Sequence, residues 1–469
     1  ADVEKLLTEY YTAESRKGLR DPVVHFYEDF LLEYDSTKKM ELGVFYTPLP
    51  VVRFILRAVD EVLKKEFDIP LGLADSQKIQ KQVTRTDSRG KQVKQSQEFH
   101  RVQILDFATG TGTFLNELVL LIHQQFTNQA GRWPSYAKAD LLPRIHGFEL
   151  MVASYTIAHI KLSMTLKETG VGELDQRLRV FLTNSLADPV DHQDQGTLLG
   201  LMQSIAEENY EASKVKSETP VMVVIGNPPY SGVSQNKAYT DNDAYKVEPG
   251  GQQKLQERKH WLDDDYVKFI MFAESFIEKN GSGVVGLITA HGYIDNPTFR
   301  GMRWHLRQTF DKIYVIDLHG NSNKKESSPD GSKDENIFDI KTGVAILIGV
   351  KKPTRTKNNQ AEVLKTDFFG TRAKKFERLN ESELTGISWQ KLPLICETWV
   401  VEGKGKKTYQ EGFATNELMA VNSTGIVSMG DEFIINMNRD VLRERVQNFI
   451  ENTPSEDELK NRFHLGKNY

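Results

Sequence analysis

Residues 227 to 230 read Asn-Pro-Pro-Tyr and come directly after the apolar run 221 to 225 and Gly226. Each proline ring fixes φ, and neither proline has an amide hydrogen to donate to a neighbouring strand. The sequence therefore predicts a buried strand that ends in a rigid, polar turn with an aromatic ring at its tip. In an open α/β sheet, ligands bind at the carboxyl ends of strands. The alternative is a structural turn in which Asn227 caps the strand and Tyr230 packs on the surface.

A second candidate ligand site follows the strand expected at 102 to 107. Residues 106 to 114 read Asp-Phe-Ala-Thr-Gly-Thr-Gly-Thr-Phe and lead into a helix. Gly110 and Gly112 allow the backbone to turn sharply and to approach a ligand closely. The amides at the start of the next helix favour a carboxylate or a phosphate. A plain strand-to-helix turn is the alternative, because a Gly-x-Gly sequence alone is weakly specific.

The next strand, expected at 145 to 149, ends in Glu149, whose carboxylate can accept both hydroxyls of a ribose. Combined with the preceding glycine turn, Glu149 favours a cofactor that carries a nucleoside. A nicotinamide dinucleotide fits poorly, since Leu115 stands where the dinucleotide motif has its third glycine. S-adenosylmethionine fits better, with its carboxylate at the helix amides, its ribose at Glu149 and its methyl group facing the turn at 227 to 230.

The elements that must position these residues alternate along the chain between strands and helices. Strands are expected at 102–107, 145–149, 179–182, 221–226, 283–288, 314–318 and 344–350, and helices at 114–125, 152–166, 197–213, 266–277 and 299–309. A further helix is expected after Thr47-Pro48, with Thr47 as its cap. This alternation predicts an α/β fold with a mostly parallel sheet and helices on both faces. The last two strands have no helix between them, so they are expected to form an antiparallel hairpin at one edge.

Composition limits the possible classes of protein. The 469 residues are 39% hydrophobic and 27% charged, as in ordinary soluble proteins. No stretch reaches the roughly 18 apolar residues that a membrane span requires. The single cysteine, Cys396, argues against a disulfide framework and favours a cytoplasmic setting. No metal site is expected, because the 11 histidines are scattered along the sequence.

These motifs together resemble those of the amino-group DNA methyltransferases of the N6-adenine type. The order of the matching pieces, 45–48, 106–114, 148–149 and 227–230, is similar to the γ arrangement. Three further segments resemble the single-polypeptide type I-like (type ISP) restriction-modification enzymes: Gly147 to Leu150, Asp265 to Phe269 and Phe299 to Arg303. The resemblance extends over about residues 30 to 350 and is thin beyond 395.

The resemblance implies a Rossmann-like methyltransferase sheet that uses S-adenosylmethionine and acts on double-stranded DNA. It implies three parts: an N-terminal helical segment at 1–40, a methyltransferase domain at 41–352, and a linker with a partial α+β target recognition domain at 353–469. Nuclease and translocase domains are expected in the full-length polypeptide, and no membrane partner is expected. The implied catalytic residues are Asn227, Pro228, Pro229 and Tyr230. The implied cofactor-binding residues are Tyr46, Thr47, Pro48, Asp106, Ala108, Thr109, Gly110, Gly112, Thr113, Phe114, Glu149, Leu150, Asn184 and Ser185, with Asp188 as a substitute for the last two.

The chemistry of an adenine amine explains why such an enzyme uses these residue types. The lone pair of this nitrogen is delocalised into the ring, so the amine is a poor nucleophile. The Asn227 side-chain oxygen and the Pro228 carbonyl can accept its two hydrogens and draw the nitrogen toward a tetrahedral state. The adenine must leave the duplex at a cost of a few kcal/mol, and stacking on Tyr230 returns about 1–3 kcal/mol.

Other functions remain open from the sequence. The tetrapeptide also occurs in enzymes that methylate RNA bases or protein glutamine, and the chain could instead serve as a DNA-recognition module of a larger restriction machine. The polar stretch 231–260 is a candidate DNA-side loop, and the Lys/Arg-rich stretches 78–101 and 371–378 are candidate phosphate contacts. Solvated surface segments are the alternative for all three.

Overall fold

The computed structural model describes residues 46–86, 92–189, 201–230, 234, 236, 239, 241–257, 260–354, 360–393, 399, 435–451 and 458. The chain divides into two compact units, Ala1–Val401 and Glu402–Tyr469. The predicted helical segment 1–40 lies outside the described residues. The second unit contains helix α15 (Arg439–Ile450), whose first turn is capped by the side chain of Asn438.

The first unit is built on a nine-stranded sheet within the described residues. Its strands are β3 (Gln103–Asp106), β4 (Ile145–Glu149), β5 (Val180–Leu182), β6 (Val221–Gly226), β7 (Gly283–Ala290), β8 (Lys312–Asp317), β9 (Val344–Lys351), β10 (Glu362–Asp367) and β11 (Gln390–Lys391). They lie in the order β11-β10-β8-β9-β7-β6-β3-β4-β5. The pairings are parallel except that β9 is antiparallel to β7 and β8, and β11 is antiparallel to β10.

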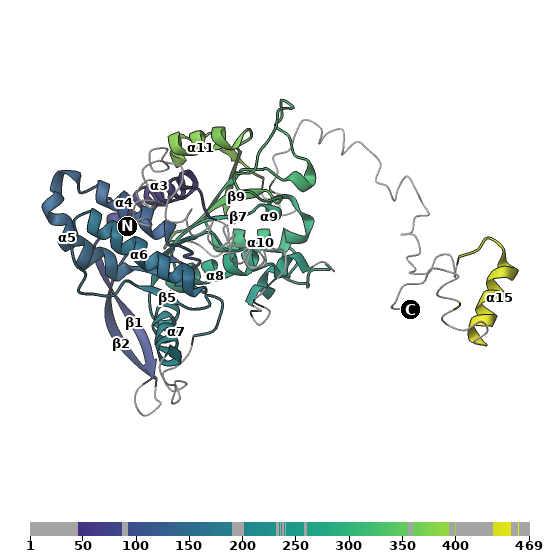
Figure 1. Cartoon of the computed structure of the whole chain (residues 1–469), viewed down its shortest axis with the longest axis horizontal. Coiled ribbons are helices and arrows are strands. Elements are labelled where there is room, and N and C mark those ends of the chain that lie inside the picture. The colour runs from purple at the N-terminus through teal and green to yellow at the C-terminus, as the bar shows by residue number, and fades with distance from the viewer. Residues whose placement is uncertain are drawn as a thin grey trace, which may run out of the picture. The chain divides into compact units, whose positions relative to one another are not determined.

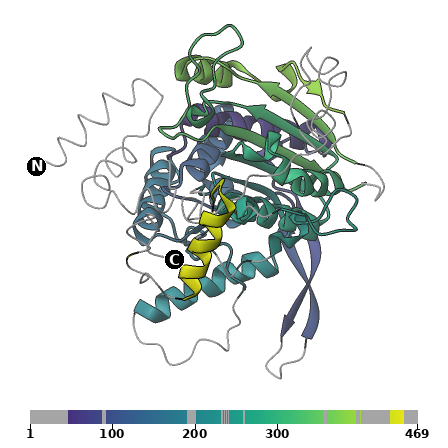
Figure 2. The ribbon, with the colours of Figure 1, turned by 90° about the vertical axis from the view of Figure 1, so that its right-hand side faces the viewer.

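The helices connect and cover these strands (Figures 1 and 2). They are α3 (Leu49–Glu66), α4 (Thr113–Gln124), α5 (Trp133–Tyr136), α6 (Val152–Glu168), α7 (Leu201–Ser217), α8 (Asp265–Asn280), α9 (Gly292–Asp295), α10 (Arg300–Thr309) and α11 (Arg372–Glu381). Short 3₁₀ or π turns occur at Gly72–Ala74, Thr127–Arg132, Ala137–Leu141, Leu142–Arg144, Asp241–Tyr245, His260–Asp263, Pro297–Phe299, Ser322–Lys324 and Leu384–Gly386. Among the described residues, none of the helices has the length and apolar character to cross a bilayer.

Strand β7 shows how both faces of the sheet are covered. A side-chain carbon added at Gly286 would lie 2.8 Å from Val59 and 3.0 Å from Ile55, both in α3. One added at Gly283 would lie 2.8 Å from Ile277 in α8. Because positions an odd number of residues apart point to opposite faces, α3 and α8 cover different faces. This explains why every residue of β7 is buried.

The predicted α/β sheet is confirmed, as are the antiparallel pairings of the last two predicted strands. Those two strands do not form the edge, however. Strand β10 pairs in parallel with β8, and β11 adds beyond it. The sheet thus continues past residue 352, where the sequence predicts the recognition domain to start. The half-polar sequence Glu-Val-Leu-Lys-Thr-Asp of β10 did not indicate a strand inside this sheet.

A separate two-stranded hairpin occupies most of the Lys/Arg-rich stretch 78–101. Strands β1 (Lys78–Thr86) and β2 (Gln92–His100) pair along their full length and extend away from the main sheet (Figures 1 and 2). Polar residues occupy both faces, so the sequence lacks the apolar alternation that marks a half-buried strand. Lys78 forms an exposed ion pair with Glu98 at 3.4 Å. A phosphate contact along this hairpin stays a prediction.

Candidate active site

The strand order creates a switch point between β3 and β6. After β3 the chain builds β4 and β5 on one side, then returns to form β6 on the other side of β3. Ligands of open α/β sheets bind at such a point, beyond the carboxyl ends of the strands. The glycine turn follows β3, and Asn227 follows β6. The structure therefore brings the two predicted motifs to adjacent strand ends.

Gly226 forms the close junction between these two motifs. Its φ is +148°, and a side-chain carbon there would lie 3.0 Å from Oδ1 of Asp106 at the end of β3. A larger residue would press against the Asp106 carboxyl group. Glycine therefore lets the strand β6 pass close to Asp106 before the Pro-Pro turn begins.

The Asn227 side chain is oriented by Thr47. Its Nδ2 atom donates a hydrogen bond of 3.0 Å to Oγ1 of Thr47, which precedes α3. Thr47 was predicted to cap α3, but Pro48 occupies the cap position and makes no side-chain cap hydrogen bond. Thr47 is buried and contacts the predicted catalytic residue instead. Because Nδ2 donates to Thr47, the oxygen of the same amide is the atom that can accept a hydrogen from a substrate.

Tyr230 is more buried than expected for a ring that stacks on a substrate base. Its side chain is 8% exposed, and its ring contacts Phe338 edge-on at a centroid distance of 6.3 Å. Burial raises the pKa of Tyr230, although a hydrogen bond with Asn227 opposes this shift. Pro228 is buried, while Pro229 is half-buried. Phe338, which comes 108 positions after Tyr230, was not predicted as a site residue. Its contact with Tyr230 depends on the path of the connection between β8 and β9.

The glycine turn has the backbone geometry that its sequence predicts. Gly110 and Gly112 have φ values of +55° and +81°, in the left-handed region that favours glycine. Gly110 faces open space, whereas a side-chain carbon at Gly112 would lie 3.1 Å from Ala158 in α6. Gly112 therefore serves the packing of α4 against α6. Gly110 keeps the turn accessible.

The Glu149 carboxylate contacts the glycine turn directly. Its Oε2 accepts a hydrogen bond of 2.7 Å from the Gly110 amide, and its Oε1 accepts one of 2.7 Å from Met151. Burial raises the pKa of Glu149, and the backbone amides of Met151, Gly110 and Leu150 partly offset this. Leu150 itself is 58% exposed beside the turn. The predicted pairing of the glycine turn with Glu149 is thus a direct contact.

Asp106 is a second carboxyl group beneath the turn. It is fully buried, and Oδ1 accepts a hydrogen bond of 3.2 Å from the Ala108 amide. Its other oxygen, Oδ2, has no hydrogen-bond partner among the described residues. Burial raises the pKa of Asp106 to about 8; the Ala108 amide opposes this shift, and the charge of Glu149 adds to it. Asp106 therefore carries a proton at neutral pH.

The remaining predicted cofactor residues divide into two groups. Ala108 and Tyr46 are half-buried near the two motifs, and Thr109 bonds through its hydroxyl to the Asp106 carbonyl at 3.0 Å. Thr113 and Phe114, in contrast, are buried in the first turn of α4, where Phe114 belongs to the hydrophobic core.

Asn184 and Ser185 reach the site from the end of β5. The Ser185 hydroxyl donates to the Phe107 carbonyl at 2.5 Å, directly beneath the glycine turn. Asn184 donates to the Asn236 side chain at 2.9 Å. Lys216 holds this turn by donating to the carbonyl of Asn184 at 2.8 Å. Asp188 is exposed and lies outside these contacts.

The segment Asp265 to Phe269 anchors the chain that follows Tyr230. The Asp265 carboxylate accepts hydrogen bonds from Ser234 at 2.6 Å and from Asn236 at 3.1 Å. The Lys268 ammonium donates to the same two residues, at 2.9 and 2.6 Å. Phe269 packs on Phe107 at a centroid distance of 5.1 Å. The sequence singled out this segment only through its resemblance to a family.

The segment Phe299 to Arg303 contacts residues of the predicted DNA-side stretch 231–260. Gly301 lets the backbone approach closely, because a side-chain carbon there would lie 2.2 Å from the Val247 carbonyl. Arg300 forms an ion pair of 2.6 Å with Glu248. Tyr245, one of the aromatic residues of the predicted DNA-side loop, is fully buried and donates to Glu274 at 2.7 Å. Tyr245 is thus a buried core residue.

Solved structures with this fold are large DNA-bound enzymes. The DrdV–DNA complex is similar with a TM-score of 0.62 and 25% identity, over 92% of this chain and 40% of that one. The type ISP restriction-modification enzyme LlaBIII bound to DNA has a TM-score of 0.62 and 25% identity, over 82% of this chain and 24% of that one. The type ISP enzyme LlaGI, at 24% identity and a TM-score of 0.60, shares the fold over 87% of this chain and 31% of that one. The chain thus spans between about a quarter and two fifths of the length of these enzymes.

The family is identified by the sequence itself. None of the curated proteins compared with the chain matches it. The family model for the N-6 DNA methylases, however, matches residues 19–296, which include the glycine turn, Glu149 and the Asn-Pro-Pro-Tyr turn. The predicted catalytic turn thus lies inside the matched region. This chain belongs to the N-6 DNA methylase family of methyltransferases.

Proposed function

We propose that this chain transfers a methyl group from S-adenosylmethionine to N6 of adenine in double-stranded DNA. The observation that carries the proposal is the adjacency of two motifs at the switch point. The glycine turn with Glu149 follows β3 and β4, and Asn227 follows β6 beside them. One motif suits a nucleoside-bearing cofactor, and the other suits an amine.

The residues around the glycine turn fit S-adenosylmethionine, which supplies an activated methyl group when bound. Gly110 faces open space, and the first turn of α4 presents backbone amides that favour a carboxylate. A carboxylate can accept about four hydrogen bonds. At Glu149, the amides of Gly110, Leu150 and Met151 already donate to it. The carboxylate can still accept a hydrogen bond from a ribose hydroxyl. The unpaired buried oxygen of Asp106 gives a further polar group beneath the turn.

Asn227 and Pro228 would activate the adenine amine. The hydrogen bond to Thr47 fixes the Asn227 amide so that its oxygen accepts from the substrate. The proline ring at 229 restricts the Pro228 carbonyl, which accepts the second hydrogen. Two fixed acceptors orient the nitrogen lone pair and stabilise the positive charge that develops on it. No strong base is needed, since the proton can leave after the transfer.

The aromatic pair Tyr230 and Phe338 would receive the extruded adenine. Stacking on an aromatic ring contributes about 1–3 kcal/mol per base. Because Tyr230 is only 8% exposed, the base can enter only after the Phe338 segment has moved from the Tyr230 ring. Binding of the adenine is therefore coupled to a local opening of the connection between β8 and β9.

We also propose that the chain works within a longer restriction-modification polypeptide that contains nuclease and translocase domains. The support is the similarity to LlaBIII, an ATP-dependent type ISP enzyme, and to a nuclease-deletion form of LlaGI. We further propose that target recognition belongs to the region 353–469, which begins with a linker. The location of the protein in the cytoplasm is proposed on the single cysteine.

The direct test is methyl transfer from labelled S-adenosylmethionine to duplex DNA, RNA and protein in parallel. We expect label on DNA, recovered as N6-methyladenine, and sequencing of the methylated sites would give the target. Asn227→Ala should abolish turnover while cofactor binding survives. Asn227→Asp, which keeps an acceptor oxygen but loses the donor to Thr47, should retain part of the activity. Label on RNA or protein with none on DNA would overturn the proposal.

A further inference from the structure

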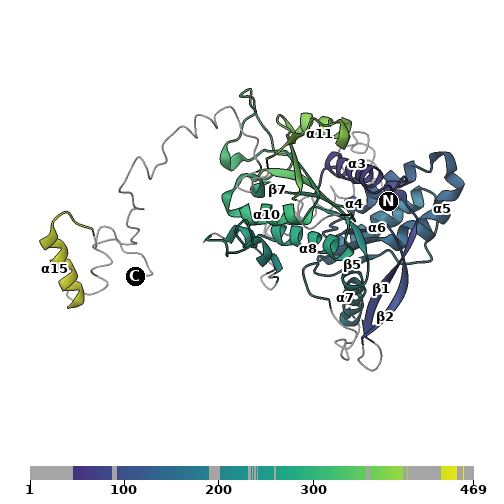
Figure 3. The same ribbon diagram turned by 180° about the vertical axis from the view of Figure 1, so that it is seen from behind.

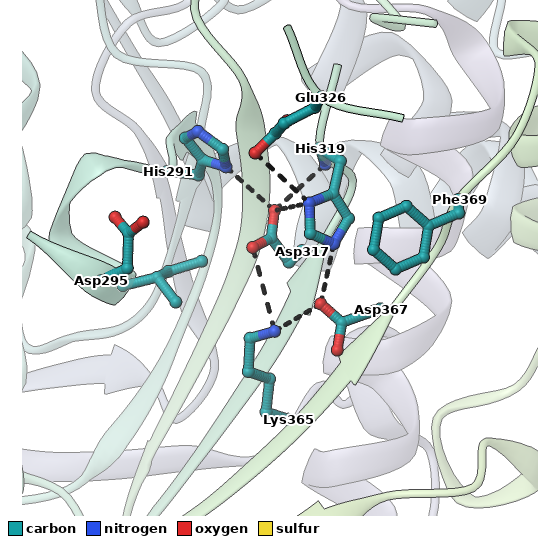
Figure 4. Close-up of a pocket in the computed structure, with 9 residues that line it drawn as sticks. His291, Asp295, Asp317, His319, Glu326, Lys365, Asp367 and Phe369 are labelled. Carbon is teal, nitrogen blue, oxygen red and sulfur yellow. Dashed lines mark hydrogen bonds and ion pairs between the residues drawn. The ribbon is translucent and has the colours of Figure 1, made fainter. Parts of the chain in front are cut away.

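A cluster of histidines and carboxylates lies outside the proposed methyl-transfer site. His291 follows β7, Asp317 ends β8, His319 follows it by two residues, and Asp367 ends β10. Glu326 joins them from the connection between β8 and β9. They line a cavity of about 290 Å³ together with Ile294, Asp295, Lys365 and Phe369 (Figure 4). The parallel strands β7, β8 and β10 thus deliver these groups to one edge of the sheet.

Four of these side chains point donor atoms toward one another (Figure 4). His291 Nδ1 lies 3.0 Å from Asp317 Oδ1, and His319 Nδ1 lies 3.7 Å from the same oxygen. Glu326 Oε1 lies 3.7 Å from His319 Nδ1. Nitrogen and oxygen donors that hold one tetrahedral ion at about 2.1 Å are separated by about 3.4 Å from one another. These three separations, 3.0, 3.7 and 3.7 Å, bracket that value.

Each histidine is held through its other ring nitrogen. His319 Nε2 lies 2.8 Å from Asp367 Oδ1, and Asp367 is paired with Lys365. His291 Nε2 lies 3.0 Å from Nδ2 of Asn321, whose Oδ1 accepts a hydrogen bond of 3.1 Å from the Lys324 amide. A metal ion at Nδ1 of His291 would place the ring hydrogen on Nε2, and the Asn321 amide would then have to turn its oxygen toward it. Carboxylates in this position, such as Asp367 at His319, orient metal-binding histidines and raise their basicity.

The charges of the cluster favour a cation. Four carboxylates line the cavity, those of Asp295, Asp317, Glu326 and Asp367, whereas Lys365 is its one lysine. A divalent ion at this place would supply two positive charges between these carboxylates.

We propose that His291, Asp317 and His319, whose donor atoms all lie within 4.8 Å of one another, bind one divalent transition-metal ion. Two imidazoles and a carboxylate suit zinc, which prefers four donors of this kind. Glu326 lies 3.7 Å from His319 Nδ1 and would have to move toward the ion to become the fourth donor. Four protein donors would close the coordination shell and give the ion a structural role. It fastens the connection between β8 and β9, which carries Phe338, to the ends of β7 and β8. The proposal stands on these contacts and is independent of the proposed methyl transfer.

The test uses the full chain, purified without metal and titrated with Co²⁺ and then Zn²⁺. We expect one ion per chain, with the visible absorption of tetrahedral Co²⁺ that Zn²⁺ removes. Zn²⁺ should also raise the melting temperature. Absence of stoichiometric binding would overturn the proposal.

Three substitutions test which residues bind the ion. His319→Gln should abolish the Co²⁺ spectrum, and Glu326→Gln, at the more exposed rim, should weaken affinity by at least about tenfold. His260→Gln is the matched control, because His260 also pairs with a carboxylate, Asp263 at 3.2 Å, but is 92% exposed. It should leave binding unchanged. Near-ultraviolet circular dichroism checks folding, and Glu326→Gln decides the matter if His319→Gln does not fold. Wild-type affinity in either cluster variant would refute the assignment.

Discussion

Asn227 donates a hydrogen bond of 3.0 Å to Thr47, a residue 180 positions earlier in the chain. The bond joins the start of α3 to the end of β6. It selects which end of the Asn227 amide faces the proposed substrate. Thr47, predicted as a cofactor contact, would therefore also act on the amine side of the proposed site.

Replacing Thr47 with valine should lower turnover while leaving cofactor affinity nearly unchanged. Valine keeps the shape of threonine but removes the acceptor, so the Asn227 amide loses the contact that fixes it. A misoriented acceptor costs about 1–2 kcal/mol of hydrogen-bond energy, or roughly tenfold in kcat. Single-turnover methylation and cofactor titration measure the two quantities. Thr47→Ser keeps the hydroxyl and should behave like the wild type; equal losses in both variants would contradict this role.

The stability of the first unit should decrease as the pH rises, because of Asp106. Its pKa is raised from 3.8 to about 8. The folded state then binds a proton that the unfolded chain has already lost above about pH 4, so stability falls with pH up to about 8. The slope is at most about 1.4 kcal/mol per pH unit.

Thermal unfolding between pH 5 and 8.5 measures this dependence, with Asp106→Asn for comparison. Asparagine does not titrate, so the melting temperature of the variant should change less with pH. Parallel curves for the two proteins would show that Asp106 is not the group responsible.

Arg372 at the start of α11 should influence base extrusion without touching DNA. Its guanidinium donates to the Asn336 carbonyl at 2.8 Å and to the Phe338 carbonyl at 3.0 Å, so it positions the ring that contacts Tyr230. Arg372→Ala should lower kcat/KM by about tenfold, as loss of positioning does. Fluorescence of 2-aminopurine at the target adenine should report weaker extrusion.

The control for Arg372 is Lys374→Ala, an exposed neighbour in the same basic stretch. If residues 371–378 contact phosphate, Lys374→Ala should weaken DNA binding and reduce its dependence on salt. If Arg372 acts through Phe338, its variant should bind DNA with an unchanged salt dependence. A uniform loss of DNA affinity in both variants would argue against the positioning role.

Lys375 should be important for folding. Its ammonium lies 2.9 Å from Asp334, and both side chains are completely buried. Removing one partner of a buried ion pair leaves the other charge unpaired and costs about 3–5 kcal/mol. Lys375→Met should therefore lower the free energy of unfolding by that amount in urea denaturation. The double variant with Asp334→Leu should recover part of the loss; additive losses would contradict the pairing.

The central part of the fold was predictable because its elements carry strong local patterns. Strands β4 and β6 begin and end at the predicted residues, since both are short, fully buried segments bounded by turns. The glycine turn was also predicted, as was a common site for this turn and Glu149, although their direct hydrogen bond was not. The turn after β3 needs glycine for its backbone conformation. The order of the strands then places this turn beside the end of β4, where Glu149 lies.

Other features depend on contacts between distant segments and leave no local pattern. The strand β10 and the hairpin β1–β2 are rich in polar residues, so no apolar alternation marked them. Phe338 and Thr47 join the site through tertiary contacts alone. The histidines 291 and 319 seemed scattered because 27 residues separate them, yet β7 and β8 end at the same edge of the sheet.

The packing of α11 limits how such an enzyme can exchange its specificity. Helix α11 lies beside α3, where Arg57 donates to the Leu379 carbonyl at 2.7 Å (Figures 1 and 3). The same helix supplies Lys375 and Arg372 to the segment that carries Phe338. A chimaera joined at residue 352 would therefore replace part of the catalytic support along with the recognition region. A junction after Val401, where the first unit ends, would keep that support together with the proposed methyl-transfer site.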